Sequence, residues 1–238
     1  YRKWYEGSPS LIPPPEKTVP GMSAAGEDLA RAIEAGEKIA VFCDYDVDGT
    51  SAGEVLRRSL PPYGAKLHYG YASAAAGFGL TNDFVKKAAE QGCKVLVTLD
   101  CGSGQAEQIA LAQQLGMKVI VVDHHEVAAN PADHHLNPKL YDPPSSENTG
   151  AQLGKETMHL AGMGALADMG SVVLPENRAF FWHAAEHPAP GVRALAAELD
   201  EDPFTPGQMV LTQACLNLPK RTTKVTGLGQ DHLAWGEG

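Results

Sequence analysis

The sequence lacks several features that would place it in a specialised class of protein. Its 238 residues hold four cysteines (Cys43, Cys93, Cys101 and Cys215) with no Cys-x-x-Cys pair, so we expect free thiols rather than a disulfide framework. No apolar run approaches the roughly 20 residues that a membrane-spanning helix needs, and no membrane partner is expected. Lys and Arg number 19 against 29 Asp and Glu, and this net charge of −10 argues against a protein that coats duplex DNA.

The ends of the chain carry little hydrophobic pattern. The chain begins with Tyr1 rather than Met and has no apolar signal-peptide segment, so we expect a cytoplasmic protein and a piece of a longer chain. Residues 1–22 contain Pro13-Pro14-Pro15 and Pro20 and are predicted to form an N-terminal arm.

Short apolar runs rich in β-branched residues predict an α/β fold. They occupy residues 39–43, 95–99 and 119–122, and residues 66–71 predict a fourth strand. Helical patterns lie between them at about residues 52–60, 82–91 and 105–115. Continuous rather than alternating apolar runs are typical of strands buried on both faces of a parallel sheet. We therefore predict a parallel β-sheet flanked by helices, followed by a helical segment.

An aspartate follows each of the three apolar runs at once: Asp44, Asp100 and Asp123. Parallel strands joined by crossover helices all point the same way. These three carboxylates are therefore expected on one rim of the sheet, where open α/β folds bind ligands.

The segment Asp44-Tyr45-Asp46-Val47-Asp48-Gly49 carries a carboxylate at every second position as the chain leaves a predicted strand. Such a cluster repels itself unless cations hold it. Asp100 and the run Asp123-His124-His125 add oxygen and imidazole donors, a mixture that suits Mn²⁺ or Mg²⁺ and could accept Zn²⁺. Two divalent ions bridged by one carboxylate would activate water for an in-line phosphoryl displacement.

Two other interpretations of the first acidic segment explain less of the sequence. An EF-hand loop that began at Asp44 would need Glu at its twelfth position, which is Val55. In a haloacid-dehalogenase-type phosphatase Asp46 would be the nucleophile, but that family's later Gly-Asp-x-x-x-Asp motif is missing. The pair His134-His135 has no matching acids and is expected on a surface strand.

Four motifs, taken together, resemble the DHH phosphoesterase superfamily in their order and spacing. They are Asp44–Gly49, Leu99-Asp100-Cys101-Gly102, Asp123-His124-His125 and Gly164–Met169. Within that superfamily the sequence is most similar to the RecJ-like branch of single-strand exonucleases, through Gly77-Phe78-Gly79-Leu80, Asn137-Pro138 and residues 167–178. The resemblance covers about residues 29–178.

The resemblance implies a cofactor of two Mn²⁺ (or Mg²⁺) ions and a set of ligands for them. Asp46 and Asp48 would each ligate one ion, and Asp100 would bridge both. His124 and Asp168 would complete the coordination of the second ion.

The same resemblance implies roles for three neighbours of these ligands. His125 would face the scissile phosphate as a catalytic donor. Asp123 would orient a histidine from behind the ligands, and Asp44 is also expected behind them rather than on an ion.

The resemblance also divides the chain. Residues 1–22 would be the arm, residues 23–178 the DHH catalytic domain, and residues 179–238 a helical extension and linker. Members of the superfamily usually carry a second, C-terminal lobe with a glycine-rich motif. No such motif follows Arg178, so we expect that lobe to be absent or truncated.

The implied function is a RecJ-like exonuclease that hydrolyses single-stranded DNA from the 5′ end to mononucleotides. Its expected partners are single-stranded DNA or short oligonucleotides, together with replication or repair proteins. A nanoRNA or cyclic-dinucleotide phosphodiesterase is favoured instead by the acidic charge and by Ser73-Ala74-Ala75-Ala76, where the branch usually has an arginine. A non-catalytic RecJ-like replication or repair scaffold is the alternative of another class. A pyrophosphatase is disfavoured because that branch has a histidine where this chain has Phe42.

Overall fold

The computed structural model describes residues 19–73, 78–140 and 157–167. The chain divides into two compact units, Pro13–Gln152 and a second one made of Tyr1–Ile12 with Leu153–Gly238. The described part of the first unit contains a β-sheet with its helices. The described part of the second unit is Thr157 and helix α7 (Met158–Ala167).

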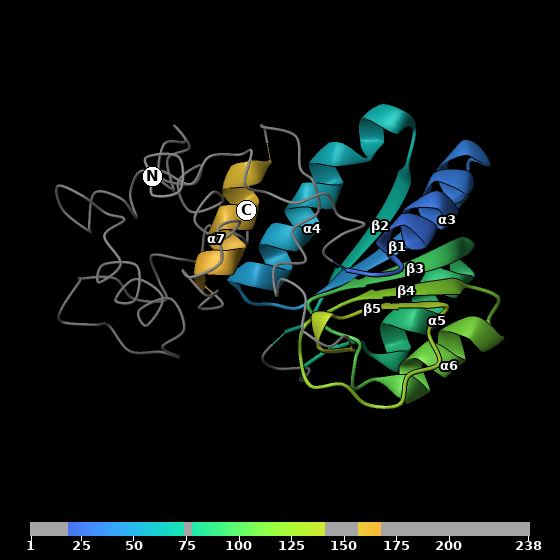
Figure 1. Ribbon diagram of the computed structural model, residues 1–238. Coiled ribbons are helices and arrows are strands. Elements are labelled where there is room, and N and C mark those ends of the chain that lie inside the picture. The colour runs from blue at the N-terminus through green and yellow to red at the C-terminus, as the bar shows by residue number, and fades with distance from the viewer. Residues whose placement is uncertain (1–18, 74–77, 141–156, 168–238) are drawn as a thin grey trace, which may run out of the picture. The chain divides into compact units, whose positions relative to one another are not determined.

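The sheet of the first unit has five parallel strands in the order β2-β1-β3-β4-β5 (Figure 1). The strands are β1 (Lys38–Cys43), β2 (Lys66–Tyr71), β3 (Cys93–Leu99), β4 (Lys118–Val122) and β5 (His134–Leu136). The predicted parallel sheet is thus confirmed, and His134-His135 lies on its edge strand as expected.

Helices cover both faces of this sheet. They are α3 (Met22–Glu34), α4 (Val47–Ser59), α5 (Asn82–Glu90) and α6 (Ala106–Gln114), with 3₁₀ turns at Pro61–Tyr63 and Pro138–Leu140. Along β1, Ile39 and Val41 belong to the core shared with α3 and α4, whereas Ala40 and Phe42 belong to the core shared with α5 and α6. Burial on both faces explains why the strand sequences are apolar without alternation.

Helix α4 begins at Val47, earlier than the predicted start near residue 52, because an acid of the first motif caps it. The Asp46 side chain accepts a hydrogen bond from the backbone N–H of Gly49 (2.9 Å). An aspartate at this position satisfies an N–H group that the first turn of a helix leaves free. The acidic segment therefore spans the end of β1, at Asp44, and the start of α4, which Asp46 caps.

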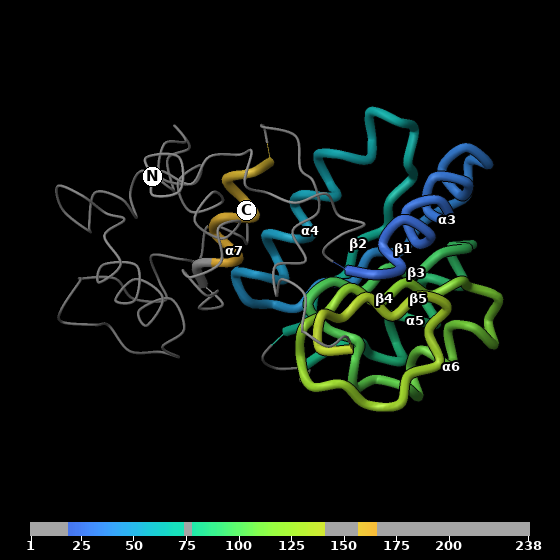
Figure 2. The backbone as a smooth tube through the Cα atoms, in the orientation of Figure 1, coloured from blue at the N-terminus to red at the C-terminus, as the bar shows by residue number. Residues whose placement is uncertain are grey.

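The direction in which strands are added to the sheet reverses at β1. From β1 the chain passes through α4 to β2 on one side, and then crosses to β3 on the other side of β1 (Figure 2). In open α/β sheets such a reversal leaves room for a ligand beyond the carboxyl ends of the two diverging strands.

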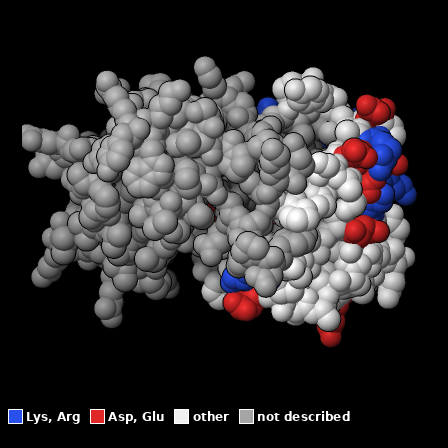
Figure 3. Space-filling model, viewed as in Figure 1, with Lys and Arg blue, Asp and Glu red and all other residues white. Residues whose placement is uncertain are grey.

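A carboxylate on α3 ties that helix to β4 and β5. Asp28 Oδ2 accepts a hydrogen bond from Lys118 Nζ (2.6 Å) and lies 2.8 Å from His134 Nε2, and Asp28 Oδ1 pairs with Arg31. The hydrogen bonds from His134, Lys118 and Arg31, in that order, hold the pKa of Asp28 well below its usual range. Figure 3 shows acidic and basic side chains side by side at this edge of the described surface.

None of the helices in residues 19–73, 78–140 and 157–167 combines the length and apolar character that crossing a membrane requires.

Replacement of Gly49 should separate α4 from the end of β1. A Cβ at Gly49 would lie 2.6 Å from the carbonyl oxygen of Asp44, and backbone atoms there cannot move aside. Gly49→Ala should lower the free energy of unfolding by about 1–3 kcal/mol, as overpacking does. Gly26→Ala in α3, where a Cβ would meet nothing within 4 Å, should instead raise it by about 0.5–1 kcal/mol. Equal shifts of the two variants in urea unfolding would contradict this packing.

The Asp28 cluster should give stability a defined pH dependence. Because the pKa of Asp28 is lower in the folded chain than the unfolded value of about 3.9, its contribution is present above that pH and is lost as the pH falls through the folded pKa. Asp28→Asn should therefore be less stable than wild type at neutral pH, with the difference shrinking below pH ~4. Urea unfolding at several pH values measures this. Asp83→Asn, which changes an exposed acid of α5, is the control.

Candidate metal centre

The backbone places three aspartates at adjacent strand ends. The N–H of Asp44 donates to the carbonyl of Leu99 (3.1 Å), the N–H of Asp100 to Val122 (2.9 Å) and the N–H of Asp123 to Leu136 (3.0 Å). Each aspartate thus extends the hydrogen-bond ladder of the parallel sheet by one step. The predicted gathering of these acids on one rim follows directly from the parallel sheet.

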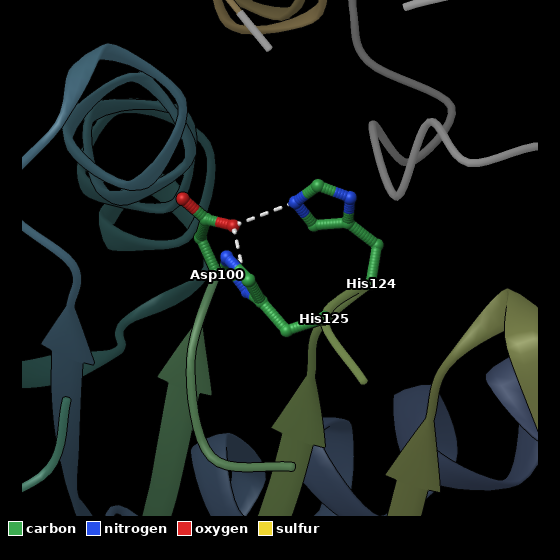
Figure 4. Close-up of side chains that lie close together, drawn as sticks. All are labelled: Asp100, His124 and His125. Carbon is green, nitrogen blue, oxygen red and sulfur yellow. Dashed lines mark hydrogen bonds and ion pairs between the residues drawn. The ribbon is translucent and has the colours of Figure 1, made fainter. Parts of the chain in front are cut away.

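Two groups of side chains converge at this rim. Asp100, His124 and His125 offer ligand atoms that all lie within 4.8 Å of one another, and Asp44, Asp46 and Asp100 do the same. Asp100 belongs to both groups. Figure 4 shows Asp100 at the end of β3 and the two histidines at the end of β4, with their polar atoms turned toward each other. We call the union of the two groups the carboxylate–histidine cluster.

Asp100 is the buried centre of the cluster. Its side chain is 3% exposed, Oδ1 lies 3.0 Å from His124 Nε2, and Oδ2 is buried with no hydrogen-bond partner among the described residues. Burial raises the pKa of this carboxyl far above its usual range, and the carboxylates of Asp48 and Asp46 raise it further. The site therefore disfavours a negative charge on Asp100 unless a positive charge is supplied.

The backbone of Asp100 is also unusual. Its φ of 59° is the one positive value at a non-glycine residue among the described residues. Aspartate tolerates this left-handed conformation better than most residues, at a cost of about 1 kcal/mol or more. Strain of this kind persists where the surrounding structure holds it, and here it occurs at the acid that belongs to both groups of the cluster.

Asp44 and the start of α4 supply the rest of the acidic half of the cluster. Asp44 is buried, its Oδ1 has no hydrogen-bond partner among the described residues, and burial raises its pKa. Asp46 is exposed and lies at the helix cap, and Asp48 Oδ2 lies 3.9 Å from His124 Nε2. The sequence led us to expect Asp44 behind the ligands, and in the structure Asp44 also offers an oxygen within 4.8 Å of ligand atoms of Asp46 and Asp100.

Asp123 differs from the other acids because its hydrogen bonds are complete. Oδ1 accepts from the backbone N–H groups of His124 (2.8 Å) and His125 (3.1 Å) and contacts His125 Nδ1 (2.8 Å), and Oδ2 accepts from the N–H of Ser103 (2.8 Å). Burial opposes ionisation of Asp123, but the hydrogen bonds from His125 and Ser103 outweigh it and keep the pKa below its usual range. Four contacts therefore engage both oxygens of this carboxylate, which fits a supporting role better than a ligand position.

The two histidines occupy different environments. His124 is 13% exposed and its Nε2 is directed at Asp100. His125 is 56% exposed, its Nδ1 faces Asp123, and this hydrogen bond raises the pKa of His125 above its usual range. His124 therefore fits a ligand position, whereas His125 keeps Nε2 for another partner.

The cluster fits divalent cations of the Mn²⁺ and Mg²⁺ type. Two buried carboxylate oxygens without partners, on Asp44 and Asp100, lie in one cluster with an imidazole nitrogen. Burial of unpaired carboxylates is costly, and oxygen donors with one imidazole are suitable ligands for these ions.

The described residues contain all but one of the expected site residues. The rim of the sheet brings together Asp44, Asp46, Asp48, Asp100, Asp123, His124 and His125. Asp168 lies outside the described residues, as do the helical patterns beyond it. Phe42, at the position of the histidine in the pyrophosphatase branch, is 2% exposed and packs against Phe84 in the core with ring centroids 4.9 Å apart.

Two polar residues behind the cluster had no predicted role. Ser103 and Asn137 are fully buried, and the Asn137 side chain donates to Ser103 Oγ (2.9 Å). Asn137-Pro138 belonged to the resemblance without an assigned function. The only signal in the sequence was that Asn137, a polar residue, directly follows a predicted strand. This position does not show which loops the Asn137 side chain contacts.

Comparisons with known proteins agree with this fold. The sequence matches the DHH family, N-terminal domain, over residues 38–171. A crystal structure of exonuclease RecJ bound to manganese has a TM-score of 0.68 at 24% identity, with 85% of this chain and 56% of that chain covered. RecJ from Thermus thermophilus in complex with Mn²⁺ has a TM-score of 0.66 at 24% identity, with 89% and 33% covered.

Curated relatives are similar in sequence over part of their length. The single-stranded-DNA-specific exonuclease RecJ of Bacillus subtilis is 30% identical over 107 residues, which are 44% of this chain and 14% of that protein. The protein of the same name from Thermus thermophilus is 28% identical over 178 residues, 66% of this chain and 27% of that protein. The chain thus spans about a quarter or less of these relatives. With its parallel sheet, its acidic rim and a family match over more than half of its length, the chain belongs to the DHH family.

Proposed function

We propose that this chain is the catalytic part of a metal-dependent phosphodiesterase, a RecJ-like exonuclease that hydrolyses single-stranded DNA from the 5′ end to mononucleotides. The observation that carries the proposal is the cluster centred on Asp100, where acids from two strand ends meet two histidines. The names of the relatives support the substrate, and the two solved RecJ structures with manganese support the cofactor.

The proposed ligands divide the cluster between two ions. Asp46 and Asp48 would each ligate one ion, and Asp100 would contribute to both sets. His124 would join the second set together with Asp168, which is carried over from the family resemblance and lies outside the described residues. The orphaned oxygen of Asp44 makes it a further candidate ligand. Bound divalent cations would lower the pKa of water and neutralise charge on the phosphoryl oxygens.

The residues of the chain supply positioning and a proton donor. His125 points Nδ1 at Asp123, so its Nε2 is the atom that donates to an oxygen of the scissile phosphate. Asp123, saturated by hydrogen bonds, holds the imidazole in this orientation. Asp100, whose backbone is left-handed, offers its carboxylate to both groups of the cluster.

The proposal includes the division of the chain and its cellular setting. Residues 23–178 would be the catalytic domain, with the arm before it and the helical extension after it. The protein would act in the cytoplasm with replication or repair proteins.

A second candidate substrate class is short RNA or a cyclic dinucleotide. The net charge of −10 and the mixture of acidic and basic side chains on the described surface favour a small substrate. Turnover of a 5′-labelled single-stranded DNA ladder, compared with a dinucleotide and a cyclic dinucleotide, separates the two. Release of the 5′ label as a mononucleotide in the first turnover supports the exonuclease, whereas a ladder of shortened labelled products would indicate digestion from the 3′ end. Cleavage of the dinucleotides alone supports the second candidate.

Asp100→Asn should remove metal binding without disturbing the fold. Asparagine has the same shape and tolerates the same left-handed backbone, but it lacks the negative charge that bridges two ions. Turnover with Mn²⁺ should fall by a factor of about 100 or more. The metal-free variant should be at least as stable as wild type, because one buried carboxylate has been neutralised.

Thermal unfolding with and without Mn²⁺ provides the readout. Mn²⁺ should raise the melting temperature of wild type and of the control Asp83→Asn, and leave that of Asp100→Asn unchanged. An unaltered response of Asp100→Asn would refute the bridging role. The absence of any response in wild type would favour the non-catalytic scaffold.

His125→Ala should slow the reaction while Mn²⁺ remains bound. Its Nδ1 is engaged by Asp123 and its ring is exposed, so its loss removes a donor rather than a ligand. The value of kcat should fall by a factor of about 10²–10⁴, and Mn²⁺ affinity measured by calorimetry should stay within about threefold. His124→Ala should instead weaken Mn²⁺ binding, because His124 Nε2 lies beside Asp100 at the proposed ligand position. The two histidines would be exchanged in role if His125→Ala lost the metal instead.

A further inference from the structure

Asn137 stands behind the carboxylate–histidine cluster and uses all of its polar atoms. It is 0% exposed and follows directly after β5. Its Nδ2 donates to Ser103 Oγ (2.9 Å) and to the backbone carbonyl of His125 (3.0 Å), and its Oδ1 accepts from the N–H of Lys139 (2.9 Å). A buried asparagine with two donations and one acceptance is held in a single orientation.

These contacts join three loops at the carboxyl end of the sheet. Ser103 lies after β3, His125 lies after β4, and Asn137 itself follows β5. The Asn137 side chain and the Asp123 carboxylate share two partner residues. Asn137 donates to Ser103 and His125, and each of these two residues donates its backbone N–H to the Asp123 carboxylate. Asn137 therefore holds the same two segments to which Asp123 is bonded.

The local fold explains why an asparagine stands at this position. Leu136 accepts the N–H of Asp123, so the next residue lies beside the loop that carries the histidines. Pro138 begins a 3₁₀ turn in which the N–H of Leu140 donates to the carbonyl of Asn137 (3.1 Å). This turn holds the Asn137 backbone while the side chain reaches across two strand ends.

Ser103 extends the network to the edge strand. Its Oγ lies 2.9 Å from Nε2 of His135 in β5. Because Ser103 Oγ accepts from Asn137, its single hydroxyl hydrogen can be donated to Asp123 or to His135. In either case Ser103 links Asn137 to a second polar residue at this end of the sheet.

The exposure of His125 makes it dependent on such a network. Its side chain is 56% exposed, so packing does little to hold the ring. Its orientation rests on Asp123 at Nδ1 and on the position of its own backbone, which Asn137 sets through the carbonyl. We propose that Asn137 is a positioning residue that fixes the His125 imidazole relative to the cluster, through the His125 carbonyl and through Ser103. This inference rests on the proposed function, in which His125 donates to the phosphate.

Asn130 provides a matched control, because it joins the same loops without contacting the histidine segment. Its Nδ2 donates to the backbone carbonyls of Gly102 (2.8 Å) and, more weakly, Ser103 (3.4 Å), and its Oδ1 accepts from the N–H of Ala132 (3.0 Å). Asn130→Ala thus removes a side-chain amide that links the β4–β5 loop to the loop after β3. Asn137→Ala also removes an amide that links these two loops, through His125 and Ser103. A purely structural role predicts that the two variants lose activity in proportion to stability.

The test compares Asn137→Ala, Asn137→Asp and Asn130→Ala in the full chain. Asn137→Asp keeps the shape and the acceptor for Lys139 but replaces both donations by a carboxylate oxygen that faces two acceptors. With Mn²⁺ and a single-stranded oligonucleotide, kcat of both Asn137 variants should fall about 10–100-fold, the loss usual for residues that orient a functional group. Their KM should stay within about twofold and Mn²⁺ affinity within about threefold, because no ligand has been removed. Asn130→Ala should keep kcat within about threefold despite a comparable loss of melting temperature.

Amide hydrogen exchange at His125 gives a readout that does not need turnover. The His125 N–H donates to Asp123, and its exchange should accelerate about tenfold or more in both Asn137 variants and little in Asn130→Ala. Equal acceleration in Asn137→Ala and Asn130→Ala would overturn the positioning role, as would a loss of kcat that follows Mn²⁺ affinity. If wild type hydrolyses no oligonucleotide or dinucleotide, the proposed function fails, and the exchange data alone decide whether Asn137 holds His125.

Discussion

Repulsion among acids at one end of a parallel sheet is the interaction on which the site depends. Three carboxylates, Asp44, Asp46 and Asp100, have ligand atoms within 4.8 Å of one another, and two of them carry a buried oxygen without a partner among the described residues. Two full charges at that separation repel by about 3–4 kcal/mol at an effective dielectric constant of 20. The raised pKa of Asp100 is one expression of this repulsion. Divalent cations would turn the same arrangement from unfavourable to favourable.

The sheet makes this concentration of charge tolerable because its backbone fixes the acids without help from their side chains. Each strand-end aspartate is held by an N–H bond to the neighbouring strand, so its carboxylate is free for other contacts. Asp123 is the exception, and its four hydrogen bonds turn it into support for His125 rather than a ligand. Asn137 reinforces that support from behind. One part of the rim, around Asp100, has a left-handed backbone and carboxylates that fit cations. The other part, around Asp123, has its polar groups engaged in hydrogen bonds.

The sequence predicted the fold well because burial on both faces gives parallel strands a continuous apolar signal. It also located the acidic rim, since Asp44, Asp100 and Asp123 each follow such a run. It could not show that Asp123 is saturated while Asp44 keeps a free oxygen, because that difference arises from loop contacts made by Ser103 and His125. The early start of α4 was missed because Asp46 acts as a helix cap as well as a candidate ligand. The role of Asn137 depends on contacts with two distant loops, and these contacts leave no periodic pattern in the sequence.

Anomalous X-ray diffraction at the manganese edge, from crystals of the full chain grown with Mn²⁺, tests the central claim most directly. The account predicts two anomalous peaks about 3.5–4 Å apart at the carboxyl ends of β1, β3 and β4, with Asp100 in contact with both. Crystals that contain Mn²⁺ but show no peak at Asp100, or show peaks only at other parts of the surface, would contradict it.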